Sequence, residues 1–473
     1  MSNFMKNWHI VGICGIGMSA LAQFARSQNI GVSGSDRALE KSENAQLKAM
    51  LQAQGIELYP QDGSRFAPGN PPVDAVVYSS AIEESNPDFA SSQGIERLHR
   101  ATALKELILQ QCSSGKVSVA VAGTCGKTST TAIISEALNN AGDDPECING
   151  GMVKAFMTEK YPGNYRPGKG AIVFEADESD KSLLEFHPDY ALVLNIGTDH
   201  YPKAELAEMF ACFVNQCRKG AVLEKEVFEL IGDKIKPDLV IKTFSGKTDD
   251  SNWCISDYKN QAGRSLARFN NGEWHALPSP GRHTALNAAA AAALLELSGY
   301  DPKLALRCAL NTHGVARRFD YKGKTACGAK IYDDYAHNPE KLATVLSAAQ
   351  EVSGTSGRVL MLFQPHGYGP FKFMAEELGR VFKKLLRSND KVYLAEPFYA
   401  GGTSSFSPHA EDVLQQWQNT YTDINVELFA DRQTLKTLLR QQAAENDVIL
   451  IAGARDNTLA MFASELADGG KML

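Results

Sequence analysis

Strand-like apolar runs lead into glycine-bearing turns and then into helical patterns at three places along the chain. These are residues 9–28, residues 117–142 and the segment that begins at residue 359. An apolar run, a turn and then apolar positions at helical spacing are typical of parallel α/β architecture. We therefore predict an α/β protein with parallel sheets.

The same patterns divide the chain into three predicted domains. Residues 112–116 (CSSGK) indicate a linker, residues 245–277 alternate as in a small antiparallel excursion, and four strand candidates begin near 329, 358, 391 and 447. We expect a Rossmann-like domain over 1–112, a central P-loop ATPase-like domain with a parallel sheet over 113–317, and a second Rossmann-like domain over 318–473.

Composition narrows the class of protein. The 473 residues are 44% hydrophobic and 22% charged, as in a globular enzyme, and the formal charge of −7 gives no basic footprint for nucleic acid. The nine cysteines include no CxxC pair, and no apolar run approaches the length of a membrane span. The N-terminus does not show the pattern of a secretory signal. We expect a cytoplasmic protein that acts on neither nucleic acid nor membranes.

A phosphate-binding loop is predicted at residues 122–130 (AGTCGKTST), between a strand and a helix. Backbone N–H groups of such a turn surround a phosphate, Lys127 would neutralise β- and γ-oxygens, and the Thr128 hydroxyl would bind Mg²⁺. The pattern departs from G-x-x-x-x-G-K-[ST], because position 121 is valine. The residues predicted to bind ATP here are Gly123, Thr124, Cys125, Gly126, Lys127, Thr128 and Ser129.

Acidic residues follow two apolar strands of the same region. Glu175 ends one strand, and His200 lies just beyond the other, beside Asp199. Carboxylates suit Mg²⁺, and an imidazole occasionally takes a place beside them, so Glu175 and His200 are candidate metal ligands in addition to Thr128. Asp177 and Asp180 are equally typical of a solvated loop.

A second glycine loop follows the first strand, at residues 12–18 (GICGIGM), and Ser35-Asp36 follow the second strand. The spacing is G-x-x-G-x-G rather than the dinucleotide G-x-G-x-x-G, but a glycine loop at this place suits a diphosphate. Taken alone, it favours an NAD-binding domain and a nucleotide-sugar domain almost equally.

The pair Arg317-Arg318 and the segment 333–339 (DDYAHNP) hold charged residues near the predicted third domain. An arginine could stabilise a transferring phosphoryl group, and Asp334 could accept from a ribose hydroxyl. Local sequence does not distinguish these roles from an ordinary interdomain ion pair.

Motifs along nearly the whole chain resemble the Mur ligase family. The shared segments, in order, are HIVGICGIGMSALA, GVSGSD, VVYSSAI, AVAGTCGKTSTTA, FEADESD, NIGTDH, GRHTALNAAAA, GVARRFD, YDDYAHNP and FQPH. The resemblance implies an ATP-dependent, ADP-forming ligase of peptidoglycan synthesis, which joins an amino acid, first of all L-alanine, to UDP-N-acetylmuramate through an acyl phosphate. It also implies that the first glycine loop binds a UDP-sugar and not NAD.

The resemblance assigns roles residue by residue. It implies that Lys127, Glu175, His200 and Arg318 serve catalysis, that His283 and Asn287 lie at adenine, that Arg318 reaches the γ-phosphate, and that Asp334 reaches the ribose. His337 would face the amino acid. The residues implied for the UDP-substrate are Gly15, Ile16, Gly17, Met18, Ser35, Asp36, Ser79 and Ser80.

Several positions depart from the family pattern. Cys125 replaces a histidine, Gly367 and Pro370 replace two arginines expected at the amino acid's carboxylate, and Thr403 and Arg455 change two further segments. We therefore hypothesise that Arg455 or Lys372 supplies the missing positive charge, and that the amino acid can differ from L-alanine.

Alternatives remain open. The chain could be a murein-recycling ligase that attaches a whole peptide, or an inactive homologue that binds UDP-sugar and ATP. An NAD-dependent oxidoreductase would leave the second phosphate loop and the acidic residues unexplained. Monomer and homodimer are both compatible with the sequence.

Overall fold

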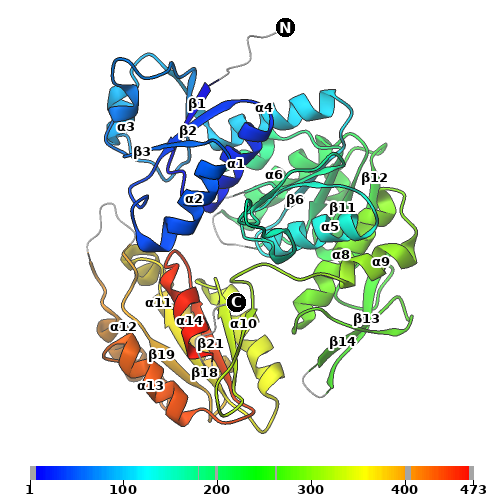
Figure 1. Ribbon diagram of the computed structural model, residues 1–473. Coiled ribbons are helices and arrows are strands. Elements are labelled where there is room, and N and C mark those ends of the chain that lie inside the picture. The colour runs from blue at the N-terminus through cyan, green and yellow to red at the C-terminus, as the bar shows by residue number, and fades with distance from the viewer. Residues whose placement is uncertain (1–6, 179, 198–200, 262–263, 400–405, 468–473) are drawn as a thin grey trace. The chain divides into compact units, whose positions relative to one another are not determined.

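The structure, a computed structural model, describes residues 7–178, 180–197, 201–261, 264–399 and 406–467. The chain forms two compact units. The first comprises residues 1–256, 269–272 and 286–315, and the second comprises residues 257–268, 273–285 and 316–473. Figure 1 shows the helices and strands of both.

The N-terminal sheet is parallel, with the order β3-β2-β1-β4-β5. Its strands are β1 (Asn7–Val11), β2 (Gly31–Ser35), β3 (Glu57–Tyr59), β4 (Ala75–Tyr78) and β5 (Glu96–His99). Its helices are α1 (Ile16–Ser27), α2 (Ala45–Ala53), α3 (Pro87–Ser91) and α4 (Arg100–Ser113), with the 3₁₀ turns η1 (Ser42–Asn44) and η2 (Ser64–Phe66). The strand order reverses between β1 and β4, where sheets of this type bind ligands.

The central sheet has the order β13-β12-β11-β10-β6-β9-β7-β8, and β14 and β15 continue from β13. The strands are β6 (Ser118–Ala122), β7 (Glu146–Ile148), β8 (Tyr165–Arg166), β9 (Ile172–Glu175), β10 (Tyr190–Val193), β11 (Gly220–Glu224), β12 (Val240–Ser245), β13 (Trp253–Gln261), β14 (Arg264–Phe269) and β15 (Trp274–Ala276). The strands from β12 to β7 are parallel, whereas β8 and β15 pair antiparallel with their neighbours.

Five helices accompany the central sheet: α5 (Lys127–Asn140), α6 (Lys203–Asn215), α7 (Lys225–Ile231), α8 (Arg282–Leu297) and α9 (Pro302–Leu310). Short 3₁₀ turns occur at η3 (Lys154–Phe156), η4 (Ser182–Glu185) and η5 (Gly232–Lys234). Residues 288–293 of α8 are all alanine and are fully buried. Alanine combines high helix propensity with a small side chain, so α8 can pack closely on its neighbours.

The C-terminal sheet has the order β16-β17-β21-β18-β19-β20, parallel except for β16. Its strands are β16 (Asp320–Lys324), β17 (Lys330–Asp334), β18 (Val359–Gln364), β19 (Lys391–Leu394), β20 (Val426–Leu428) and β21 (Val448–Gly453). Helices α10 (Pro339–Ser353), α11 (Tyr368–Leu385) and α12 (Ala410–Thr420) contribute to one hydrophobic core, and α13 (Arg432–Gln442) and α14 (Thr458–Leu466) to another. Helices thus cover both faces, and strands such as β18 are apolar throughout.

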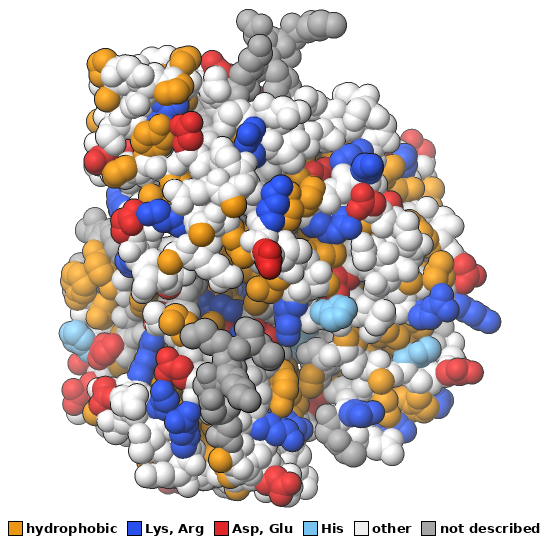
Figure 2. All heavy atoms as spheres, viewed as in Figure 1, with side chains coloured by type: hydrophobic (Ala, Val, Ile, Leu, Met, Phe, Trp, Pro, Cys, Tyr) orange, Lys and Arg blue, Asp and Glu red, His pale blue; other side chains and the backbone are white. Residues whose placement is uncertain are grey.

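These sheets confirm the predicted fold class of three α/β parts. The alternating segment near 245–277 forms β13, β14 and β15, as expected. Among the described residues, no helix is long and apolar enough to cross a membrane. On the face shown in Figure 2, Lys and Arg side chains are interspersed with Asp and Glu rather than gathered in one area.

Candidate functional site

The predicted phosphate loop joins the end of β6 to the start of α5. Gly123 and Gly126 have positive φ angles of 133° and 90°, which favour glycine. A Cβ on Gly123 would lie 3.0 Å from the Cβ of Leu194, so the loop packs directly on the end of β10. The first turn of α5 contains no acidic residue and Gly126 provides no side-chain cap, and the positive end of the helix suits an anion.

The neighbouring strand end holds the loop in shape. The Asn195 side chain accepts a hydrogen bond from the Cys125 N–H (2.8 Å) and donates one to the Cys125 carbonyl (2.9 Å). The Thr124 hydroxyl accepts from the Gly197 N–H at 2.8 Å. Sequence reasoning did not assign Asn195, although it lies in the NIGTDH segment that follows an apolar strand. The loop conformation is therefore fixed through backbone atoms of residue 125.

Lys127 points into its own loop and toward the acidic segment after β9. Its Nζ donates to the Gly123 carbonyl (2.8 Å) and to Oε2 of Glu178 (2.6 Å), and Oδ1 of Asp177 lies 3.8 Å away. Burial disfavours the ammonium charge, but Glu178 and Asp177 outweigh it and raise the pKa of Lys127. The side chain therefore stays charged at neutral pH, at the place where phosphate oxygens would bind.

Oxygen atoms of Thr128 and Glu175 converge beside the loop. The Thr128 hydroxyl donates to Oε2 of Glu175 at 3.1 Å, and Oε1 of Glu175 accepts from the Gly150 N–H at 2.5 Å. A hydroxyl and a carboxylate fit the preference of Mg²⁺ for oxygen ligands. Within the described ranges no group of three His, Cys, Asp or Glu side chains could hold a metal by itself. The predicted ligand His200, like Asp199, lies outside the described residues.

Other residues predicted for ATP lie on two helices. Ser129 is in the first turn of α5. A Cβ on Gly126 would lie 3.5 Å from Oδ1 of Asn287, so Asn287 adjoins the loop. His283 precedes Asn287 by one turn of α8 and belongs to the second unit, where burial lowers its pKa to about 4. Contact with adenine remains a prediction for both.

The first glycine loop joins β1 to α1. Gly12 has φ 77°, Gly15 precedes the helix, and the first turn, which holds Ile16, Gly17 and Met18, has no acidic residue and no side-chain cap. A Cβ on Gly17 would lie 2.6 Å from a terminal nitrogen of Arg100, so the glycine leaves room for that guanidinium. Helix terminus and cation together suit a diphosphate. Arg100, which begins α4, was missed by sequence reasoning.

The remaining residues predicted for the UDP-substrate differ in exposure. Ser35 is fully buried and donates a hydrogen bond to Asp88, so its side chain is engaged in the core. Asp36 accepts from the Cys14 N–H at 3.0 Å and thus shapes the glycine loop. Ser79 and Ser80 directly follow β4, at the reversal of strand order.

Arg317 and Arg318 lie in the second unit, together with Asp334. Both guanidinium groups lie over the Tyr335 ring, at 5.0 and 5.2 Å from its centre. Arg317 also donates to the Gly453 carbonyl at 2.7 Å. Asp334 accepts from the N–H groups of Phe319 and Ala336, both at 2.6 Å, and burial raises its pKa. Contacts of Arg318 with the γ-phosphate and of Asp334 with ribose remain predictions.

His337 packs against His366 at the carboxyl ends of β17 and β18. The ring centres are 4.6 Å apart, and Nδ1 of His337 lies 2.8 Å from the Tyr335 carbonyl. Burial lowers the pKa of His337 to about 3, so this imidazole is neutral at pH 7. A neutral ring here can accept a hydrogen bond but is a poor proton acceptor at neutral pH.

The two cations hypothesised for the amino acid's carboxylate are both exposed. Lys372 lies in the second turn of α11, and Arg455 follows β21 with φ 65°. Gly367, with φ 148°, precedes α11, and Pro370 lies in its first turn. Thr403 lies outside the described residues.

A further cation near the carboxyl ends of β18 and β21 was not foreseen. Arg432 donates to Gln364 at 2.9 Å, to Thr458 at 2.6 Å and to Asp456 at 2.5 Å. Its only local signal was its place at the start of a helical pattern. These contacts hold the ends of the two strands together.

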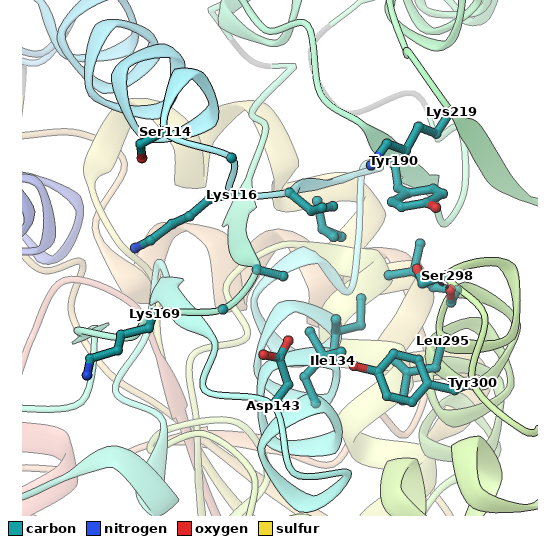
Figure 3. A pocket seen from close by; sticks show the side chains of 17 residues that line it. Ser114, Lys116, Ile134, Asp143, Lys169, Tyr190, Lys219, Leu295, Ser298 and Tyr300 are labelled. Carbon is teal, nitrogen blue, oxygen red and sulfur yellow. Dashed lines mark hydrogen bonds between the residues drawn. The ribbon is translucent and has the colours of Figure 1, made fainter.

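A cavity of about 480 Å³ lies at the opposite end of the central strands from the phosphate loop. Val117 and Tyr190, near the amino ends of β6 and β10, line it. Figure 3 shows Asp143 and Tyr300 on one side and Tyr190 and Lys219 on the other. It includes none of the residues predicted for ATP, metal or UDP-substrate.

Three family descriptions match consecutive parts of the chain. Residues 7–111 match the Mur ligase family, catalytic domain, residues 121–295 the Mur ligase middle domain, and residues 317–455 the Mur ligase, glutamate ligase domain. The matches follow the order of the three sheets.

Similar proteins include UDP-N-acetylmuramate–L-alanine ligases. The one from Thermobifida fusca is 31% identical, over 95% of this chain and 94% of its own length, and the one from Renibacterium salmoninarum is 32% identical, over 99% of each. The crystal structure of the UDP-N-acetylmuramate-alanine ligase from Thermotoga maritima superposes with a TM-score of 0.77 at 25% identity, over 97% of each chain. A murein peptide ligase from Psychrobacter arcticus shares the fold, with a TM-score of 0.67 at 20% identity over 98% of each chain. The resemblance predicted from the motifs is confirmed, and the chain belongs to the Mur ligase family.

Proposed function

We propose that the protein is an ATP-dependent ligase that joins L-alanine to UDP-N-acetylmuramate through an acyl phosphate. The observation that carries the proposal is the phosphate loop, in which Lys127 stays charged beside Glu178 while Thr128 and Glu175 converge next to it. The full-length similarity to L-alanine ligases supports the choice of substrates.

In the proposed reaction, the N-terminus of α5 binds the triphosphate and Lys127 neutralises its β- and γ-oxygens. Thr128 and Glu175 would hold one Mg²⁺, and His200 would serve a second metal site; the metal charge would offset the negative charge that otherwise keeps a carboxylate away from a phosphate. We assign the N-terminus of α1 and Arg100 to the UDP diphosphate.

The chemistry proceeds in two displacements. A carboxylate oxygen of the muramic acid attacks the γ-phosphorus, the bond to the β-phosphate oxygen breaks, and ADP leaves. The amine nitrogen of the amino acid then attacks the acyl carbon, an amide bond forms, and phosphate leaves with the carbon–oxygen bond electrons. The amine loses its proton to water, and His337, whose pKa burial lowers to about 3, would accept a hydrogen bond from the amine rather than its proton.

We place this reaction in the cytoplasm. All nine cysteines lie among the described residues and none forms a disulfide, which supports a reducing compartment.

The test is phosphate release from ATP in the presence of UDP-N-acetylmuramate, with mass spectrometry of the product. L-alanine, a panel of other amino acids and a murein tripeptide serve as acceptors. We expect release and a single amide product with L-alanine. A product with the tripeptide alone would identify a peptide ligase, and no release with any acceptor would overturn the proposal.

A further inference from the structure

A buried polar seam joins α1 to β8 inside the first unit. Asn164, just before β8, is fully buried, and its side chain donates to the Ile16 carbonyl at 2.7 Å and to the Ser19 hydroxyl at 2.9 Å. Its Oδ1 accepts from Nε2 of Gln23 at 3.1 Å. Ile16 belongs to the first glycine loop, so Asn164, which lies in the region of the central sheet, fixes the backbone of that loop.

The seam continues to the phosphate loop. The Asn164 carbonyl accepts from the Asn149 N–H at 2.8 Å, and Nδ2 of Asn149 donates to the Thr128 carbonyl at 3.1 Å. Asn149 is buried as well, and the next residue, Gly150, donates to Glu175. An unbroken line of hydrogen bonds therefore runs from Ile16 in one loop to Thr128 and Glu175 at the other.

Because these hydrogen bonds are buried, breaking one of them costs more free energy than breaking a bond exposed to water. Water does not replace a partner lost inside the protein, so a displaced amide leaves several groups unsatisfied. The favoured positions of Ile16 and Thr128 are thus linked through the segment 149–150 and Asn164, and a ligand that fixes one end restricts the other.

We propose that Asn164 and Asn149 are positioning residues that couple the two loops, so that UDP-N-acetylmuramate on the first raises affinity for ATP on the second. This rests on the proposed function, which assigns those ligands to the loops. Binding coupling is reciprocal, so ATP also raises affinity for the UDP-substrate by the same factor.

Tyr165 offers a matched control. It neighbours Asn164 in sequence, is also fully buried, and packs against Phe24 of α1. Its hydroxyl lies 2.7 Å from the Ser27 hydroxyl and 2.7 Å from Oε1 of Glu146. Ser27 ends α1, far from its first turn, so Tyr165→Phe perturbs the same seam without touching the glycine loop.

The experiment is calorimetric titration of the full chain with the non-hydrolysable analogue AMPPNP, with and without saturating UDP-N-acetylmuramate. In the unmodified protein we expect the UDP-substrate to tighten AMPPNP binding about fivefold or more. In Asn164→Ala and in Asn149→Ala we expect this ratio to fall to about one, and in Tyr165→Phe to stay unchanged. A general loss of stability would weaken binding without removing the ratio.

If one asparagine variant does not fold, the other still tests the proposed coupling, because the two substitutions break the line of hydrogen bonds at opposite ends. An unmodified protein that shows no coupling, or asparagine variants that keep its ratio, would overturn the inference. If the variants bind both ligands and form the amide normally but keep the ratio of the unmodified protein, the coupling role of Asn164 and Asn149 is overturned and the proposed function stands. Failure to bind either ligand or to form the amide overturns the proposed function.

Discussion

The ammonium of Lys127 lies 2.6 Å from the carboxylate of Glu178, within the loop that would receive the ATP phosphates. The carboxylate keeps the lysine charged and in place before a nucleotide arrives. The γ-phosphate would then take over from a carboxylate of similar charge, so the buried cation has a partner in both states.

Replacing Lys127 by methionine removes this cation and keeps most of the side-chain length. We expect kcat for phosphate release to fall about 100-fold or more, because one charged donor to the transferring phosphoryl group is lost. Lys234→Met, which breaks an exposed ion pair with Glu208, is the control. A loss below tenfold would contradict the assignment.

The metal assignment predicts a change in Mg²⁺ dependence. Thr128→Val removes the hydroxyl ligand and Glu175→Gln replaces the charged carboxylate by a neutral amide, so we expect the Mg²⁺ concentration for half-maximal activity to rise about tenfold in each variant. Phosphate release measured across an Mg²⁺ titration tests this, and chelation by EDTA should abolish it. Glu205→Gln, at an exposed ion pair with Lys181, should leave the titration unchanged.

Asp333 predicts a pH dependence of stability. Burial raises its pKa from 3.8 to about 6, although the Arg317 guanidinium 3.6 Å away opposes this. Because the folded state holds this proton more tightly than the unfolded state, the contribution of Asp333 is present below about pH 4 and is lost as the pH rises through about 6. The loss corresponds to about 3 kcal/mol.

Asp333→Asn has no such titration. We expect the free energy of unfolding of the variant, relative to the unmodified protein, to rise by up to about 3 kcal/mol between pH 4 and pH 7. Urea unfolding at several pH values measures this, with the exposed Asp423→Asn as the control. A constant difference across this range would show that Asp333 is not the group responsible.

The hypothesis for the amino-acid site concerns Arg455. Asparagine tolerates the positive φ of this position, so Arg455→Asn removes the charge with little backbone strain. We expect the KM for the amino acid to rise about tenfold or more while the KM for ATP is unchanged, as for a lost charged hydrogen bond. Lys372→Ala tests the second candidate in the same assay. An unchanged KM in both variants would remove both residues from the site.

Local patterns in the sequence predict the fold and the phosphate loop because both depend on consecutive residues. The apolar run of β6, the two glycines and the helix after Lys127 are neighbours in the chain. Asn195 and Arg100 were missed because each reaches its loop from another strand or helix, and spacing along the chain does not show which strands are adjacent.

The direction of side chains was the second property that the sequence could not predict. Ser35 is the last residue of β2 and its hydroxyl faces the buried Asp88, whereas Asp36, the next residue, faces the glycine loop. Successive residues of a strand point to opposite faces, so a dipeptide motif does not reveal which member is available to a ligand. Asn164 carried no motif, since its role depends on pairing with a helix more than a hundred residues earlier.

Asn195 holds residue 125 by its backbone N–H and its carbonyl. The side chain at position 125 therefore does not determine the shape of the loop, and other residue types at this position are compatible with the same loop. The half-buried Cys125 in the predicted triphosphate site is consistent with this. The Cys125 thiol could also be labelled covalently, by a nucleotide analogue that carries an electrophile on its phosphate chain.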